Sequence, residues 1–135
     1  MIAPTFKTII FLSVLFSLLA CLPPPPPPST VVVRDVVQGE TVTGEAIWYG
    51  ELYHGRRTDS GQQFDMRLLT GSHTTIPFGS RVEVINPETE KSVVIVINDR
   101  SHLDGGVHLA ISKAAAQELG VVDRRRFTIK YRWME

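Results

Sequence analysis

The spacing of apolar and polar residues in the second half of the chain predicts a mainly β domain. Arg81–Asn86 and Arg126–Trp133 alternate apolar with polar residues, and Ser92–Asn98 is rich in β-branched residues. Glu45–Tyr49 is a further short strand with an aromatic end. A period of two is typical of a strand with one buried face. The Asn-Pro-Glu segment at 86–88 supplies a turn that makes the middle two strands a hairpin.

One helix is predicted, over Lys113–Leu119. Ser112 stands at the N-cap position, the segment contains three consecutive alanines, and Gly120 follows where a left-handed residue ends a helix. Many short strands with one short helix and glycine-rich turns favour a closed barrel, because closure leaves no exposed strand edge. The predicted fold class is therefore all-β, a barrel with one short α-helix.

The beginning of the chain has the pattern of an export signal. Lys7 precedes the apolar run Ile9–Leu19, which is too short for a comfortable membrane span. The following Leu-Leu-Ala-Cys at 18–21 resembles the lipobox that bacterial signal peptidase II cleaves. We therefore expect residues 1–20 to be a lipoprotein signal peptide and Cys21 to carry the lipid, which explains a lone cysteine in an exported protein. Because Leu22 is not aspartate, an outer-membrane location is favoured in a Gram-negative host.

An unbroken run of six prolines, Pro23–Pro28, follows the lipidation site. Such a run forms a polyproline helix and acts as a stiff spacer, here of roughly 20 Å. Recognition by a proline-binding partner is the alternative. Residues 21–43 are then anchor, linker and lead-in, and residues 44–135 form one domain with a single core.

Charge and histidine spacing limit the partners of this domain. Fourteen basic and fourteen acidic residues balance to a net charge of zero, which argues against a nucleic-acid-binding surface. His54, His102 and His108 do not have a zinc-ligand spacing, and no cysteine is left to assist them. We predict no metal and no other cofactor.

Four sequence blocks resemble a known family. They are Gly44–Gly50, His54–Thr58, Asp65–Gly79 with His73 in a Ser-His-Thr-Thr-Ile-Pro-Phe-Gly segment, and Val96–Arg100 with the sequence Val-Ile-Asn-Asp-Arg. In this order they resemble the rare lipoprotein A domain, a six-stranded double-psi β-barrel related to expansins and barwin. The resemblance implies binding to peptidoglycan and lytic transglycosylase activity on glycan strands stripped of stem peptides.

The resemblance also implies the site. It assigns Asp99 as the catalytic acid and base and His73 as its polar partner, placed to hydrogen-bond with the acid or with substrate. Tyr49 offers an aromatic face for a sugar ring, with core packing as the alternative. The remaining candidates for substrate binding are Gln62, Arg56, Thr58, Asp65, Asn98 and Arg100.

Asp99 can be assessed from the residues around it. It ends a run of valines and isoleucines, so we expect it at the rim of an apolar barrel, where desolvation raises the pKa of a carboxyl group. Pleating places Asn98 and Arg100 on the opposite face. A protonated carboxyl there can donate to a glycosidic oxygen. The alternative is a turn aspartate that accepts hydrogen bonds from nearby backbone amides.

Two departures from the family pattern leave a second function open. Gln62 stands where family members often carry glutamate, and Ala110 stands where many carry aspartate. An amide binds sugar hydroxyls but transfers no proton. The alternative to an enzyme is a non-catalytic, expansin-like module that binds peptidoglycan. A barwin-like domain that binds proteins is a weaker alternative, since such domains depend on several disulfides.

Overall fold

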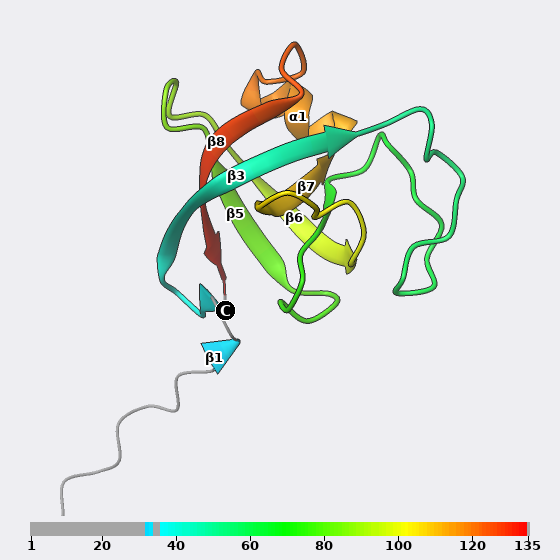
Figure 1. The fold of residues 1–135 in the computed structure, drawn as a ribbon, viewed down its shortest axis with the longest axis horizontal. Helices are drawn as coiled ribbons and strands as arrows, with labels where there is room; N and C mark the ends of the chain where they lie inside the picture. Colours follow the sequence, from blue (N-terminus) through cyan, green and yellow to red (C-terminus); the bar gives the residue numbers. More distant parts are fainter. Residues whose placement is uncertain (1–31, 34–35, 135) are drawn as a thin grey trace, which may run out of the picture.

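The computed structural model describes residues 32–33 and 36–134 (Figure 1). The expected signal peptide at 1–20, the lipidation site Cys21 and the proline run at 23–28 lie outside the described residues. Val32–Val33 (β1) and Val36–Val37 (β2) pair as a small antiparallel sheet. Within the described part of the chain, no helix has the length and apolar character needed to cross a membrane.

Six strands close into a barrel, as the sequence predicts. Around the barrel they follow the order β3-β7-β4-β6-β5-β8 (Figure 1). The pairs β3–β7 and β4–β6 are parallel, and the other four are antiparallel. The strands are Thr41–Tyr49 (β3), Thr70–Ser72 (β4), Arg81–Ile85 (β5), Ser92–Asp99 (β6), Val107–Ser112 (β7) and Arg126–Trp133 (β8).

The elements with the clearest local pattern have the predicted positions. The helix α1 spans Lys113–Leu119, the Ser112 side chain accepts a hydrogen bond from the N–H of Ala115, and Gly120 is left-handed with φ 70°. β8 has the predicted bounds, and β5 and β6 form the predicted hairpin. β3 begins at Thr41, earlier than the predicted strand. The sequence pattern does not predict β4 and β7, because their hydrogen bonds come from strands distant in sequence.

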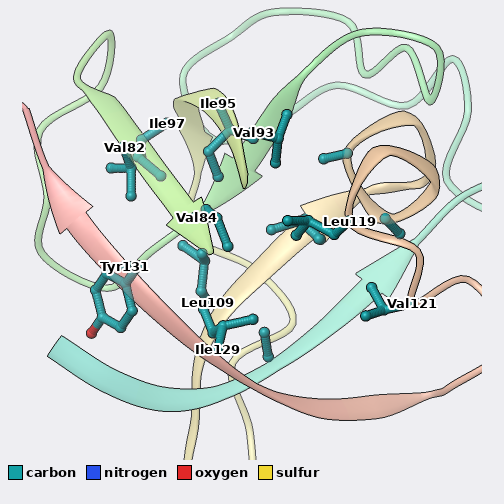
Figure 2. Packing of buried hydrophobic residues seen from close by; sticks show 14 of the residues in the cluster. Val82, Val84, Val93, Ile95, Ile97, Leu109, Leu119, Val121, Ile129 and Tyr131 are labelled. Atoms are coloured by element: carbon teal, nitrogen blue, oxygen red, sulfur yellow. The ribbon is translucent and has the colours of Figure 1, made fainter. Parts of the chain in front are cut away.

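Apolar side chains from the inner faces of the strands fill the barrel (Figure 2). β4 is short and contributes little volume, and Gly71 within it allows close packing. A Cβ at this position would lie 2.6 Å from Cδ1 of Ile95 and 3.0 Å from the carbonyl oxygen of Ala110. The fully buried aliphatic residues include Val82, Val84, Ile95, Ile97, Leu109, Leu119 and Ile129.

A second apolar cluster fastens the long connection between β3 and β4 to the outside of the barrel. Tyr49 and Ala110 from the barrel pack with Phe64 from this connection. Residues 55–64 form a tight loop, in which the N–H of Phe64 donates to the carbonyl of Arg56 at 2.7 Å. The loop therefore has a defined position beside the end of β6.

Candidate active site

A cleft of about 210 Å³ lies where the 55–64 loop meets the ends of β3 and β6. Of the residues that the sequence assigns to the site, Tyr49, Arg56, Thr58 and Asp99 line this cleft. Its walls combine aromatic rings, two guanidinium groups and one nearly buried carboxylate. The other lining residues are Tyr53, Arg57, Phe64, Ser101 and His102.

Asp99 is the last residue of β6 and is only 5% exposed. Its Oδ1 atom accepts hydrogen bonds from the backbone N–H groups of Asp59 at 3.1 Å and Arg100 at 2.9 Å. The hydroxyl of Ser101 donates to the same oxygen at 3.2 Å. The 55–64 loop and the turn after β6 thus supply three donors to one carboxylate.

These donors decide the charge state of Asp99. Burial raises the pKa of Asp99, as the sequence predicts. The hydrogen bonds that its charged form accepts lower the pKa by a larger amount, so the pKa of Asp99 lies below the ordinary value of 3.8. The prediction of a raised pKa is therefore wrong for the free protein. The alternative interpretation, an aspartate that binds backbone amides at a strand end, describes the observed geometry. Asp99 is ionised at neutral pH when the cleft is empty.

The imidazole of His73 lies away from the cleft lining. His73 is 3% exposed, and its Nδ1 accepts hydrogen bonds from the N–H groups of Thr75 at 3.1 Å and Ile76 at 3.2 Å. Its ring centroid is 5.8 Å from that of the core residue Tyr131. Acceptance of two N–H bonds at Nδ1 places the ring proton of a neutral histidine on Nε2.

His73 instead contacts Asp99 through main-chain hydrogen bonding. The N–H of His73 donates to the carbonyl of Asp99 at 3.3 Å, and its own carbonyl accepts from Nη1 of Arg100 at 2.7 Å. The guanidinium of Arg100 also lies 4.0 Å from the centroid of the Phe78 ring. His73 and Arg100 therefore hold the strand end that carries Asp99, and neither lines the cleft.

The side chains of Gln62 and Asn98 form a hydrogen bond to each other, and neither residue lines the cleft. Nδ2 of Asn98 donates to Oε1 of Gln62 at 3.2 Å. Oδ1 of Asn98 is buried and has no hydrogen-bond partner within residues 36–134. The loop also approaches Asn98 through its main chain, because the N–H of Ser60 donates to the Asn98 carbonyl at 3.3 Å.

Asp65 belongs to a separate ion pair. Both of its carboxylate oxygens accept hydrogen bonds from the guanidinium of Arg67, at 2.9 and 2.8 Å. The Arg67 side chain lowers the pKa of Asp65 to about 2. Asp65 does not line the cleft. The guanidinium of Arg67, two residues away, balances the charge of Asp65.

Sequence reasoning missed part of the cleft. The ring of His102 lies 4.2 Å from that of Tyr53 and 5.0 Å from that of Tyr49, between centroids, and forms an aromatic wall with them. His102 has a left-handed backbone with φ 69°, which is uncommon outside glycine. Asp59 was missed as well, although its backbone and side chain both contact the Asp99 turn. Neither residue has a periodic pattern or motif that would single it out.

The titratable residues around the cleft do not gather into a metal centre in the part of the chain that the structure covers. Within residues 32–33 and 36–134, no three or more His, Cys, Asp or Glu residues are grouped so that they could hold a metal ion.

Comparison with known proteins identifies the family. The model of the family described as "Lytic transglycolase" matches residues 41–131, which span the barrel from the start of β3 into β8. The chain belongs to the lytic transglycolase family. The six-stranded barrel of this lytic transglycolase domain is accordingly a double-psi β-barrel, as the resemblance implies.

Curated relatives share the domain over part of their length. The lytic transglycolase domain is 43% identical over 97 residues to the endolytic peptidoglycan transglycosylase RlpA of Neisseria meningitidis serogroup A, a match over 72% of this chain and 41% of that protein. It is 41% identical over 85 residues to the protein of the same name from Vibrio cholerae, over 63% of this chain and 32% of that one. The chain thus spans less than half the length of these relatives.

Solved structures share the fold at low sequence identity. The Streptomyces papain inhibitor superposes with a TM-score of 0.61 at 20% identity, over 75% of this chain and 100% of that one. An expansin of Clavibacter michiganensis, solved as a point mutant in complex with cellohexaose, superposes with a TM-score of 0.58 at 17% identity, over 71% of this chain and 51% of that one. These likenesses establish the shared barrel fold.

Proposed function

We propose that this lytic transglycolase domain cleaves the glycan strands of peptidoglycan and leaves 1,6-anhydromuramic ends. The observation that carries the proposal is the nearly buried Asp99 in a cleft lined by aromatic rings, in a chain whose relatives are named endolytic peptidoglycan transglycosylases. A cleft of this composition suits a sugar polymer, because ring faces pack on aromatic side chains and hydroxyls pair with polar atoms.

In the proposed mechanism Asp99 acts first as an acid and then as a base. Its proton goes to the glycosidic oxygen as the bond from that oxygen to C1 breaks. The C6 hydroxyl of the same muramic acid attacks C1, and its proton returns to Asp99. No water is consumed, so one carboxyl group suffices where a hydrolytic glycosidase needs two.

This mechanism requires Asp99 to be protonated when substrate is bound, whereas the free protein holds it ionised. A sugar ring over the cleft removes water from the carboxylate, and desolvation favours the neutral form. His73 and Arg100 serve as positioning residues that hold the end of β6 through the main chain of His73.

The arginines of the cleft support the proposed preference for strands without stem peptides. Removal of a stem peptide leaves a free lactyl carboxylate on muramic acid. Arg56 and Arg57 both line the cleft, and guanidinium groups bind carboxylates well. Tyr49, Tyr53 and His102 offer ring faces to the sugar on the same cleft.

We further propose that the domain is exported and anchored to a membrane by a lipid on Cys21, on the outer membrane if the host is Gram-negative. The lipobox-like Leu-Leu-Ala-Cys at 18–21 supports this location. The proline run after it acts as a spacer that holds the barrel above the lipid surface.

The test supplies denuded glycan strands to the parent protein and to Asp99→Asn, followed by mass spectrometry of the products. We expect anhydromuramic ends from the parent and none from Asp99→Asn, since an amide transfers no proton. Asp123→Asn is the matched control, because Asp123 is exposed and does not line the cleft, and it should keep the parent's activity. Failure of the parent protein to produce such ends would refute the enzymatic proposal.

A non-catalytic, peptidoglycan-binding module is the second candidate. The lowered pKa of Asp99 and the amide at Gln62 favour it, since neither group holds a transferable proton in the free protein. This candidate predicts that the protein sediments with intact sacculi and releases no soluble fragments from them. Release of fragments by the parent protein, but not by Asp99→Asn, decides against it.

A further inference from the structure

A tight turn before β5 presents an exposed aromatic ring. The turn runs from Pro77 to Ser80, whose N–H donates to the carbonyl of Pro77 at 3.2 Å. Gly79 at its third position is left-handed, with φ 86°. Phe78 stands at the second position and is 42% exposed. Among the large apolar side chains that are exposed within residues 36–134, it is the aromatic one.

Hydrogen bonds fix this turn to the strand that carries Asp99. The N–H of Gly79 donates to the carbonyl of Ile97 at 2.8 Å, and the N–H of Ile97 donates to the carbonyl of Ser80 at 3.0 Å. Ile97 lies two positions before Asp99 in β6. The backbone on the C-terminal side of Phe78 is therefore held beside β6, close to the end of that strand.

The guanidinium of Arg100 holds the ring of Phe78 itself. It lies over the ring, 4.0 Å from the centroid, and a cation is attracted to the face of an aromatic ring. Nη1 of Arg100 also donates to the carbonyls of His73 at 2.7 Å and Asp99 at 3.3 Å. The ring is thus packed on a group that is bonded to the strand end, so its position is defined before any ligand arrives.

Contacts lead from the cleft through Asp99 to Phe78. The carboxylate of Asp99 accepts a hydrogen bond from the N–H of Asp59, on the 55–64 loop that borders the cleft. The main-chain carbonyl of Asp99 accepts from the guanidinium that packs on Phe78. Phe78 does not line the cleft. The exposed ring is therefore a neighbour of the catalytic carboxylate outside the cleft.

The cleft alone is small for a sugar polymer. Its volume is about 210 Å³, whereas pockets that enclose a small-molecule ligand usually have roughly 300–1,000 Å³. An enzyme that cuts within a strand must accept sugar rings on both sides of the bond that breaks. Sugars beyond the cleft need a surface to contact, and a fixed aromatic ring suits the apolar face of a sugar because little freedom is lost on binding.

We propose that Phe78, held by Arg100, is a second binding position for the glycan strand, outside the cleft. A sugar ring beyond the bond that breaks packs on the exposed part of the Phe78 ring, while the cleft holds the sugars on the other side of that bond. This inference rests on the proposed function. It makes the affinity for glycan depend on strand length, because only a longer strand reaches both positions.

The test is calorimetric titration of denuded glycan strands of increasing length into Asp99→Asn, which leaves the strands intact. Adding Phe78→Leu keeps an apolar side chain but removes the ring, so we expect long strands to bind roughly three- to tenfold more weakly and the shortest strands to lose less. Phe78→Tyr keeps the ring and should restore the binding of long strands. Val122→Ala is the matched control, because Val122 is 39% exposed and does not line the cleft, and it should bind as the Asp99→Asn protein does.

Two results would overturn the inference. An unchanged affinity for long strands in Phe78→Leu means that the ring does not contact glycan. An equal loss for short and long strands means that the substitution acts on the cleft through Arg100. The proposed function fails separately: a parent protein that forms no anhydromuramic ends is not a transglycosylase, even if Phe78→Leu weakens the binding of long strands.

Discussion

Removal of the Tyr49 hydroxyl should stabilise the domain and leave the binding of glycan unchanged. The hydroxyl is buried and lacks a hydrogen-bond partner within the described chain, although Tyr49 lines the cleft. Burial also raises the pKa of Tyr49, so its hydroxyl stays protonated. Tyr131 provides the matched comparison, because its hydroxyl is paired with Nδ1 of His108 at 3.3 Å.

The expected changes in the free energy of unfolding have opposite signs at Tyr49 and Tyr131. A buried hydroxyl without a partner costs about 1–3 kcal/mol, so we expect Tyr49→Phe to raise the free energy of unfolding by about 1 kcal/mol. For a domain of this size that corresponds to a rise in Tm of roughly 4–8 °C. Tyr131→Phe breaks an existing hydrogen bond and should lower the free energy of unfolding by about 1 kcal/mol.

Glycan binding should not change at Tyr49. The hydroxyl is buried, and Tyr49→Phe keeps the aromatic ring that lines the cleft, so the affinity for denuded strands should stay close to that of the parent protein. Tyr131→Phe should leave this affinity unchanged, since Tyr131 lies in the core and not in the cleft lining.

The assay combines guanidinium denaturation with calorimetric titration of denuded glycan strands into each variant. If Tyr49→Phe is less stable than the parent protein, the hydroxyl has a bound partner and the argument from its burial fails. If Tyr49→Phe binds glycan much more weakly than the parent does, the hydroxyl contacts substrate and the argument from its burial fails as well.

Two further predictions concern the acid stability of the domain and its anchoring. Hydrogen bonds from Arg67 lower the pKa of Asp65 to about 2, so this pair stabilises the fold above the unfolded-state pKa of about 4 and is lost as the pH falls toward 2. Asp65→Asn should therefore show a shallower fall in Tm between about pH 4 and pH 2 than the parent and Asp123→Asn, and equal slopes would contradict this. For the anchor, Cys21→Ala should abolish the incorporation of labelled palmitate in cells, while labelling at the parent's level would exclude lipidation at Cys21.

The charge state of Asp99 connects these tests to the mechanism. Three hydrogen bonds hold the carboxylate ionised in the empty cleft, which would be an obstacle for a general acid in a rigid, hydrated site. The obstacle to the proposed mechanism is smaller if bound substrate displaces water from the cleft and so favours the neutral carboxyl group.

Features coded by neighbouring residues were predictable from the sequence. The helix with its Ser112 cap and Gly120 end, the β5–β6 hairpin and the bounds of β8 depend on local capping, turn residues and alternation. The closed barrel also followed, because many short strands need closure to remove their edges. The position of Asp99 at a strand end is a local feature of the same kind.

What the sequence did not determine depends on contacts between distant segments. β4 is a Thr-Gly-Ser segment that becomes a strand only between β6 and β7. The pKa of Asp99 depends on a loop 40 positions earlier, and the ring of His73 packs toward Tyr131 rather than lining the cleft. Alternation and capping act over a few residues, whereas hydrogen bonds that cross the fold set the ionisation of a carboxylate and the direction of a side chain. Only the closed barrel, which brings these segments together, decides them.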